Sequence, residues 1–286
     1  MYEAQFYSVR ENGFLACELC PRGCIIKHEG VGFCRVRKNI NGVLYTLNYG
    51  KYTALALDPI EKKPLYHFYP GSNVLSIGTF GCSFHCAFCQ NWEIAHNLSE
   101  GKDITPDSLA RLAIELADRG SVGVAYTYSE PLMWFEFVFD AAREVKKAGL
   151  KNILVTNGFI RPKPLSRLLP YIDALNIDVK GFTSEFYQKI LKGEFAPVLA
   201  ALKKAYQAGK HVEITTLLIP GLNDSEEEIV QLRDWIVAHL SPEVPLHFTR
   251  YFPNYRMNIE PTPLKTLQMA RNVALEKLKY VYLGNV

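Results

Sequence analysis

The sequence lacks the features that mark secreted, membrane-spanning and nucleic-acid-binding proteins. Its N-terminus, MYEAQFYSVR, does not have the basic-then-apolar layout of a secretory signal. No stretch approaches the roughly 20 apolar residues that a membrane-spanning helix needs. The 32 basic side chains nearly balance the 29 acidic ones, and no run of Lys and Arg suits a phosphate backbone. We therefore expect a cytoplasmic protein that does not bind membranes, and the charge pattern does not imply nucleic-acid binding.

The sequence also lacks the even cysteine count of a disulfide framework. Its seven cysteines fall into two groups, CELCPRGC followed by Cys34, and CSFHCAFC, which leave no cysteine over. An odd total with spacings of two and three residues favours metal ligation by reduced thiolates over disulfides. Thiolates that stay reduced also agree with a cytoplasmic location.

Alternating short apolar runs and longer helical stretches indicate the fold class. With 286 residues and 48% hydrophobic content, the chain can bury a large core. Ser225 and Glu228 form a capping box, which predicts the start of one of the helices. Six strand–helix units in a row predict an α/β fold with parallel strands, either a partial (β/α) barrel or an open doubly wound sheet. The apolar runs are NVLSIGT, VGVAYTY, NILVTN, ALNIDVK, HVEITTLLI and PLHFTR, with a final KYVYLGN.

The chain divides into three predicted parts. Residues 1–70 form a small cysteine-rich region, in which Asn41-Gly42 predicts a β-hairpin because both central residues of such a turn need positive φ. Residues 71–255 carry the alternating strands and helices. Residues 256–286 add a helix and a strand that pack against them.

The polar loops that follow the strands are predicted to lie together. In parallel α/β folds, chemistry collects at the C-terminal ends of the strands. A cofactor at that end of the sheet would meet all of these loops. In chain order they are GCSFHCAFC, TYSEP, TNGFIR, DVKG and LIPGLND.

The first of these loops offers three thiolates, from Cys82, Cys86 and Cys89. A [4Fe–4S] cluster has four irons, so three cysteines leave one iron open to a small molecule, whereas electron-transfer ferredoxins close all four with cysteine. The alternative is a zinc site completed by His85 or His96. Structural zinc prefers closed four-ligand sets with paired spacings, which disfavours this alternative.

The sequence CSFHCAFC resembles the Cys-x3-Cys-x-aromatic-Cys signature of radical S-adenosylmethionine (SAM) enzymes. The segments TYSEP, VTNGFIR, LNIDVKG and LLIPGLND resemble, in order and position, those of pyruvate formate-lyase activating enzymes. The EKKPLYHFYPG segment and the N-terminal cysteines are most similar to the radical enzyme of the AmmeMemoRadiSam group. The resemblance covers essentially the whole chain. It implies a partial (β/α)6 barrel over residues 71–255, with a [4Fe–4S] cluster and SAM as cofactors.

The resemblance also implies roles for residues in the strand-end loops. The implied roles are adenine packing for Phe88, binding of the methionine amino group for Ser129 and Glu130, contact with ribose and carboxylate for Asn157, Gly158, Asp178 and Lys180, and backbone approach to the adenine for Ile219, Pro220 and Gly221. Three of these residues also have a purely structural alternative. Phe88 would cover the cluster with apolar surface, Glu130 would favour the N-terminus of the next helix, and Lys180 would pair with Asp178.

The activity implied by the resemblance is reductive cleavage of SAM. A low-potential donor of the ferredoxin or flavodoxin type would supply the electron, and the resulting 5′-deoxyadenosyl radical would abstract hydrogen from a substrate. The first candidate substrate is a protein, through a glycyl residue of a partner enzyme. Two other classes stay open: an iron–sulfur electron-transfer or redox-sensing protein without radical chemistry, and a zinc-knot binding module on an α/β scaffold.

The N-terminal cysteine group supplies four thiolates within eighteen residues, from Cys17, Cys20, Cys24 and Cys34. Four thiolates close either a tetrahedral zinc site or a complete auxiliary [4Fe–4S] cluster, and the spacing does not decide between them. A structural zinc would hold together a region with little core of its own. A second cluster would relay electrons or bind the substrate.

Overall fold

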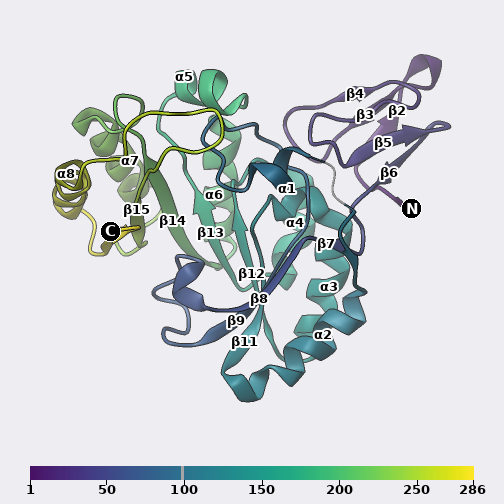
Figure 1. Cartoon of the computed structure of the whole chain (residues 1–286), viewed down its shortest axis with the longest axis horizontal. Helices are drawn as coiled ribbons and strands as arrows, with labels where there is room; N and C mark the ends of the chain where they lie inside the picture. The colour runs from purple at the N-terminus through teal and green to yellow at the C-terminus, as the bar shows by residue number, and fades with distance from the viewer. Residues whose placement is uncertain (98–99) are drawn as a thin grey trace.

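The computed structural model describes residues 1–97 and 100–286, and a single large sheet organises the main body (Figure 1). Its strand order is β16-β15-β14-β13-β12-β11-β9-β8. All neighbouring pairs are parallel except β8 with β9. Each apolar run predicted as a strand lies on one of the parallel strands. The strands are β8 (Ala54–Pro59), β9 (Asn73–Gly78), β11 (Ser121–Tyr126), β12 (Lys151–Thr156), β13 (Ala174–Asp178), β14 (His211–Leu218), β15 (Leu246–Arg250) and β16 (Val281–Gly284).

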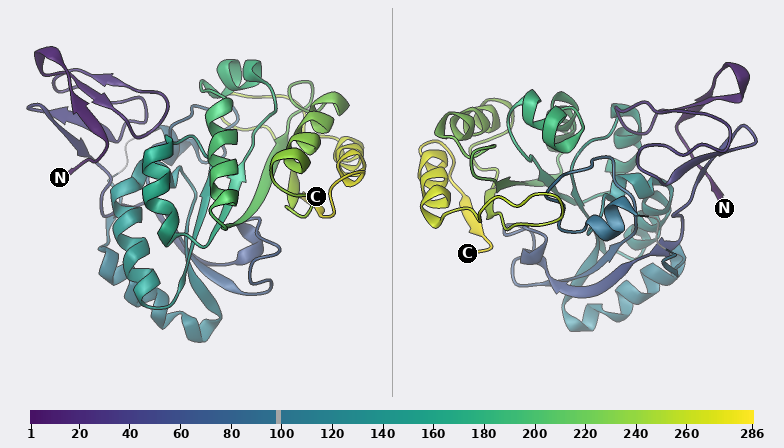
Figure 2. Two further views of the ribbon diagram at one scale, coloured as in Figure 1. Left: turned by 180° about the vertical axis from the view of Figure 1, so that it is seen from behind. Right: turned by 45° about the horizontal axis from the view of Figure 1, so that its top comes forward.

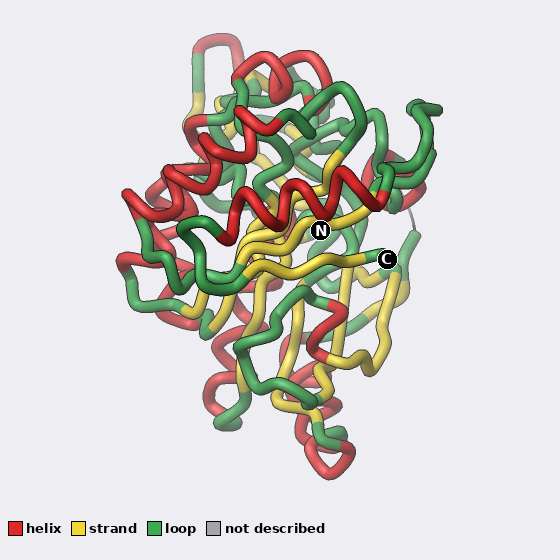
Figure 3. Tube along the Cα trace, turned by 90° about the vertical axis from the view of Figure 1, so that its left-hand side faces the viewer, coloured by secondary structure: helices red, strands yellow, loops and turns green. Residues whose placement is uncertain are grey.

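The long helices lie on one face of this sheet (Figures 1 and 2). A doubly wound sheet carries helices on both faces, whereas a barrel carries them outside only, so this arrangement corresponds to the predicted partial barrel. At the lateral edge of the sheet formed by β16, the last strand of the chain, α8 packs along that strand (Figure 3). The helices are α1 (Trp92–His96), α2 (Pro106–Glu115), α3 (Phe135–Lys147), α4 (Pro162–Leu168), α5 (Ser184–Phe186), α6 (Ala196–Gln207), α7 (Glu226–His239) and α8 (Leu264–Leu275).

The N-terminal region consists of short antiparallel strands beside the barrel (Figure 1). In the predicted hairpin, Ile40 pairs with Val43, and Asn41 and Gly42 have φ of +51° and +81°. The prediction of this turn is confirmed. The strands are β1 (Tyr2–Glu3), β2 (Tyr7–Val9), β3 (Leu15–Cys17), β4 (Ile25–Ile26), β5 (Arg37–Ile40) and β6 (Val43–Thr46), with β7 (Lys51–Tyr52) paired to β10 (Lys102–Asp103).

A buried ion pair joins this region to the barrel. The guanidinium of Arg37 donates to both carboxylate oxygens of Glu136 on α3, at 2.7 and 2.9 Å. The side chains are 1% and 0% exposed. Because charges so deeply buried are tolerated only when they are paired, the pair fixes one packing of the two parts.

Two segments depart from the sequence expectations. The strand β8 lies within residues 1–70 but belongs to the main sheet, through its pairing with β9. The capping box at α7 is only half formed: Ser225 Oγ accepts from Glu228 N at 3.2 Å, but the Glu228 carboxylate accepts from the backbone N–H of Phe182. That carboxylate therefore joins α7 to the loop after β13 instead of closing its own helix end.

Residues 60–71, here called the interior segment, enter the barrel with only part of their length, since Lys63 is buried there whereas Tyr69 and Pro70 are exposed. Ile60 and Leu65 are fully buried in a small core that they share with residues of β9, β11, β12 and β13. The carboxylate of Glu213 accepts the backbone N–H groups of Tyr66 and His67 at 3.0 and 2.8 Å. The open side of the partial barrel is thus closed by EKKPLYHFYPG and not by further strands. Among the described residues, none of the helices has the length and apolar character that crossing a bilayer requires.

Candidate active site

A cavity of about 400 Å³ opens at the C-terminal ends of the parallel strands. It is lined by the three cysteines of the loop after β9 and by residues from the ends of β11, β12, β13, β14 and β15. Its size is in the range of small-molecule sites. The predicted residues on its wall are Cys82, Cys86, Phe88, Cys89, Ser129, Glu130, Asn157, Asp178 and Lys180.

The cysteine loop is fixed by contacts from distant parts of the chain. Ala87 O accepts from Arg256 N at 2.9 Å, and His85 N donates to Leu191 O at 3.1 Å. The side-chain amide of Asn157 lies 3.7 Å from Cys82 Sγ and donates to Ser83 Oγ at 3.0 Å. These contacts hold the three thiols toward the cavity before any ligand binds.

The three thiols are poor acids in this environment. Burial raises the pKa of Cys86 to about 12 and places that of Cys82 well above its ordinary value. The pKa of Cys89 is raised for the same reason. A coordinated metal deprotonates a thiol outright, and its positive charge stabilises the thiolate that burial disfavours. The donor set therefore fits a metal cluster.

The carboxylate of Glu130 is buried and receives three hydrogen bonds. Its donors are Thr156 Oγ1 at 2.6 Å, Asn157 N at 2.8 Å and Leu132 N at 3.0 Å. Burial raises its pKa to about 7, although these hydrogen bonds act in the opposite direction. The bond to Leu132 caps the short helix Pro131–Trp134, so the structural alternative for Glu130 is realised. The same side chain still lines the cavity.

The predicted alternative for Lys180 is also realised, because its ammonium lies 2.9 Å from Asp178 Oδ2. Burial alone would lower the pKa of Lys180, but the charges of Asp178 and Cys86 raise it above its ordinary value. Both side chains line the cavity, at the end of β13. The pair offers a carboxylate and an ammonium to a ligand.

Four predicted residues do not line the cavity. Gly158 adopts φ of +68° behind Asn157, where its N–H donates to Thr156 Oγ1. The N–H groups of Ile219 and Gly221 donate to the side chains of Asn223 and Asp224, so this loop turns in on itself. The loop after β14 contributes nothing to the wall, and the strand itself contributes Thr215 and Leu217. The roles assigned to Gly158, Ile219, Pro220 and Gly221 stay predictions.

Sequence reasoning missed several wall residues. Lys62, Lys63 and Tyr128 line the cavity, but no role was predicted for them, although the lysines lie in EKKPLYHFYPG and the tyrosine in TYSEP. Within residues 1–97 and 100–286, the hydroxyl oxygens of Ser129 and Thr215 are buried without a hydrogen-bond partner. Buried polar atoms are almost always hydrogen-bonded, so unpartnered hydroxyls on a cavity wall indicate a polar ligand.

A family model described as "Radical SAM superfamily" matches residues 76–233, which include the cysteine loop and the four strand ends that follow it. The chain belongs to the radical SAM superfamily. It is 44% identical to an uncharacterized protein of Methanocaldococcus jannaschii over 291 residues, which cover 100% of this chain and 86% of that protein. It is 27% identical to the pyruvate formate-lyase 1-activating enzyme of Escherichia coli K12 over 162 residues, or 54% of this chain and 65% of that enzyme.

The solved structures agree on the fold of this radical SAM protein. A radical SAM methyltransferase from Sphaerobacter thermophilus superposes with a TM-score of 0.60 at 15% identity, over 76% of this chain and 67% of that one. The predicted partial barrel and the predicted similarity to activating enzymes are confirmed. The finer resemblance to the AmmeMemoRadiSam group stays a prediction.

The second cysteine group of this radical SAM protein surrounds a much smaller space. A cavity of about 10 Å³ is lined by Cys17, Cys20, Cys24 and Cys34, and it also touches Ser83 of the cysteine loop. Burial raises the pKa of Cys20 to about 12 and of Cys34 to about 11. Across the described chain, no three His, Cys, Asp or Glu side chains already stand in the arrangement of a single-ion site.

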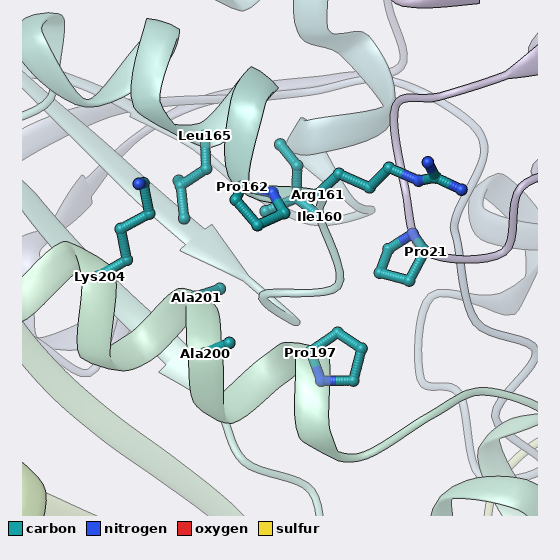
Figure 4. A pocket seen from close by; sticks show the side chains of 9 residues that line it. All are labelled: Pro21, Ile160, Arg161, Pro162, Leu165, Pro197, Ala200, Ala201 and Lys204. Carbon is teal, nitrogen blue, oxygen red and sulfur yellow. The ribbon is translucent and has the colours of Figure 1, made fainter.

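A third cavity, of about 430 Å³, lies outside the barrel between α4 and α6 (Figure 4). Its lining is mainly apolar, with Pro21, Pro162 and Pro197 around an opening that Arg161 and Lys204 flank. None of the residues of the cysteine loop lines it. It therefore does not belong to the candidate active site.

Proposed function

We propose that this radical SAM protein is an enzyme that reductively cleaves SAM at a [4Fe–4S] cluster held by Cys82, Cys86 and Cys89 and abstracts hydrogen from a substrate. One observation carries the proposal: the three thiols share a cavity wall with two buried hydroxyls, of Ser129 and Thr215, that have no partner in the described chain. The thiols suit the cluster, and the hydroxyls suit a polar cofactor beside it.

When bound, the cluster and SAM supply the electron and the 5′-deoxyadenosyl radical that hydrogen abstraction needs. The protein's own residues hold and shield these groups. Glu130 presents a carboxylate suited to an ammonium, which would favour its ionised form against the effect of burial. Asn157 keeps the Cys82 side of the loop in place. Phe88, 4% exposed on the wall, excludes water.

The electron donor is proposed to dock beside the cysteine loop. Arg22, Arg35 and Arg256 lie close enough to act electrostatically on His85, between the first two cysteines of the loop. Arg35 and Arg256 are exposed. A positive surface steers an acidic partner, so it suits an acidic low-potential carrier of the ferredoxin or flavodoxin type.

The activating-enzyme relatives support a glycyl residue of a partner enzyme as the hydrogen donor. They include an enzyme named as the benzylsuccinate synthase activating enzyme of Thauera aromatica, 24% identical over 65% of this chain. The test is the appearance of a glycyl-radical signal on a co-purified or co-expressed partner after incubation with the reduced enzyme and SAM. A partner that gains no signal while SAM is consumed contradicts this substrate.

The main experiment measures 5′-deoxyadenosine after anaerobic reconstitution with iron and sulfide and addition of dithionite and SAM. We expect product from the wild-type protein and only the protein-free background from Cys82→Ala. The matched control is Ser121→Ala, a buried small side chain at the opposite end of β11, which should retain activity. An intact, reducible cluster that yields no product in the wild type contradicts the proposal and favours an electron-transfer or redox-sensing protein.

For the N-terminal cysteines we propose a structural zinc. Four thiols around a small enclosed space match the closed four-ligand set that structural zinc prefers. Metal analysis of a variant with Cys82, Cys86 and Cys89 replaced by alanine tests this. Retained zinc supports the structural site, and retained iron supports a second cluster.

A further inference from the structure

The floor of the cavity carries two lysines that the proposed function does not use. Asp58 on β8 pairs with Val74, near the N-terminal end of β9, whereas the cysteine loop follows the C-terminal end of that strand. Asp58 therefore lies deeper in the barrel than the thiols. The ammonium groups of Lys62 and Lys63 lie 3.4 and 2.8 Å from its carboxylate oxygens, and both lysines line the cavity. Two cations against one anion leave this floor positive.

The ammonium of Lys63 has unused hydrogen-bonding capacity. Its side chain is 5% exposed, and in the described parts of the chain its one hydrogen bond goes to Asp58. The ring of Tyr128 lies beside it, with its centre 4.9 Å from Nζ. An ammonium carries three donors, and leaving them unpaired in a buried place costs free energy. The remaining donors suit the oxygen atoms of an anion.

Tyr128 is held over the floor in an unusual backbone conformation. Its φ is +68°, and Ser129 N donates to Thr127 O across it at 2.9 Å, the hydrogen bond of a γ-turn. The Tyr128 hydroxyl donates to Asp58 Oδ2 at 2.9 Å. Strained residues of this kind cluster at functional sites, where the surroundings hold them. Here the strained turn keeps Asp58 in place and leaves Lys63 facing the cavity.

We propose that Lys62 and Lys63 bind an anionic group of the substrate, a carboxylate or a phosphate, at the floor of the cavity. The inference rests on the proposed function, because it takes the cavity as the place where the substrate meets the cofactor. The anionic end would pair with the two ammonium groups, and the rest of the molecule would extend toward the cysteine loop. The substrate is then an acid, either a small molecule or an acidic side chain of a polypeptide.

Calorimetric titration of the reconstituted full-length protein tests this at low ionic strength, without SAM or reductant. The probes are inorganic phosphate, succinate and an aspartate-containing peptide, which distinguish the sources of the anion. We expect Lys63→Met to weaken binding by about tenfold or more, as loss of a charge-assisted hydrogen bond does. Lys62→Met should weaken it less, because that side chain is 67% exposed. The matched control is Lys147→Met, an exposed lysine on α3 that does not line the cavity, which should bind as the wild type does.

A second variant separates loss of the site from loss of folding. Asp58→Asn removes the anion that competes for the two lysines, so it should tighten binding, whereas misfolding would weaken it. The inference is overturned if no probe binds, if Lys63→Met binds like the wild type, or if Asp58→Asn does not tighten binding. Failure of the proposed function has a different readout, the absence of 5′-deoxyadenosine from the wild-type enzyme.

Discussion

Replacing Glu213 should loosen the interior segment that forms the cavity floor. Its carboxylate is fully buried on β14, and each of its oxygens accepts two hydrogen bonds. Oε1 accepts from His67 N and His211 Nε2 at 2.8 and 2.9 Å. Oε2 accepts from Tyr66 N and His247 Nε2 at 3.0 and 2.6 Å. In Glu213→Gln one oxygen becomes an NH2 group, so whichever way the amide turns, one backbone N–H of the interior segment loses its acceptor.

The pKa of Glu213 gives the size of the effect. Burial would raise it, but the hydrogen bonds from the two histidines and the two backbone N–H groups lower it to about 2, against a model-peptide value of 4.5. At about 1.4 kcal/mol per pH unit, this difference corresponds to roughly 3 kcal/mol of stability at neutral pH. The contribution is complete above pH 4.5 and is lost as the pH falls toward 2, because the unfolded chain then binds the proton more readily.

The measurement is the free energy of unfolding by urea, taken at pH 7 and again in steps down to pH 3. We expect Glu213→Gln to lose roughly 3 kcal/mol at pH 7 and the difference from the wild type to shrink below pH 4.5. Glu227→Gln on the exposed side of α7 is the matched control and should change stability by about 0.5 kcal/mol or less. Equal stability of Glu213→Gln and the wild type at pH 7, or a loss that does not depend on pH, would refute the reasoning.

Three further predictions concern separate contacts. Arg37→Met should lower the free energy of unfolding by urea by about 3 to 5 kcal/mol, because it leaves the Glu136 carboxylate buried without a partner. Replacing Glu136 by Leu as well should recover part of this loss, and a single variant as stable as the wild type contradicts the prediction. Gly78→Ala should cost about 1 to 3 kcal/mol in the same assay, since its Cβ would lie 2.5 Å from Thr127 O, and an unchanged midpoint would show that the turn can move aside. Arg256→Glu should slow cluster reduction by an acidic carrier in stopped-flow absorbance, with the difference shrinking as salt is raised; equal rates at low salt would place the docking surface elsewhere.

Local patterns in the sequence were sufficient to predict the parallel strands, one hairpin and the three-cysteine site of this protein. The apolar runs predicted every parallel strand of the main sheet, because a strand buried on both faces reads as a continuous apolar stretch. Asn41-Gly42 fixed a hairpin because few residues accept positive φ at both turn positions. The cysteine spacing indicated a three-thiolate site, since the ligands lie within eight residues and need no distant part of the chain.

Only the tertiary structure decided how the cavity is completed. The interior segment carries no period that predicts a return into the barrel; it is held there by Glu213, which lies more than 140 residues later on β14. In the same way, Lys63 acquires its environment from β8 and from the turn at Tyr128. The loop at Ile219 matches its expected motif but turns away, because Asn223 and Asp224 take its N–H groups. The sequence determined which groups carry the chemistry, because their spacing is local. Which groups share a wall was decided by long-range contacts, whose free energies depend on the packing of the whole barrel.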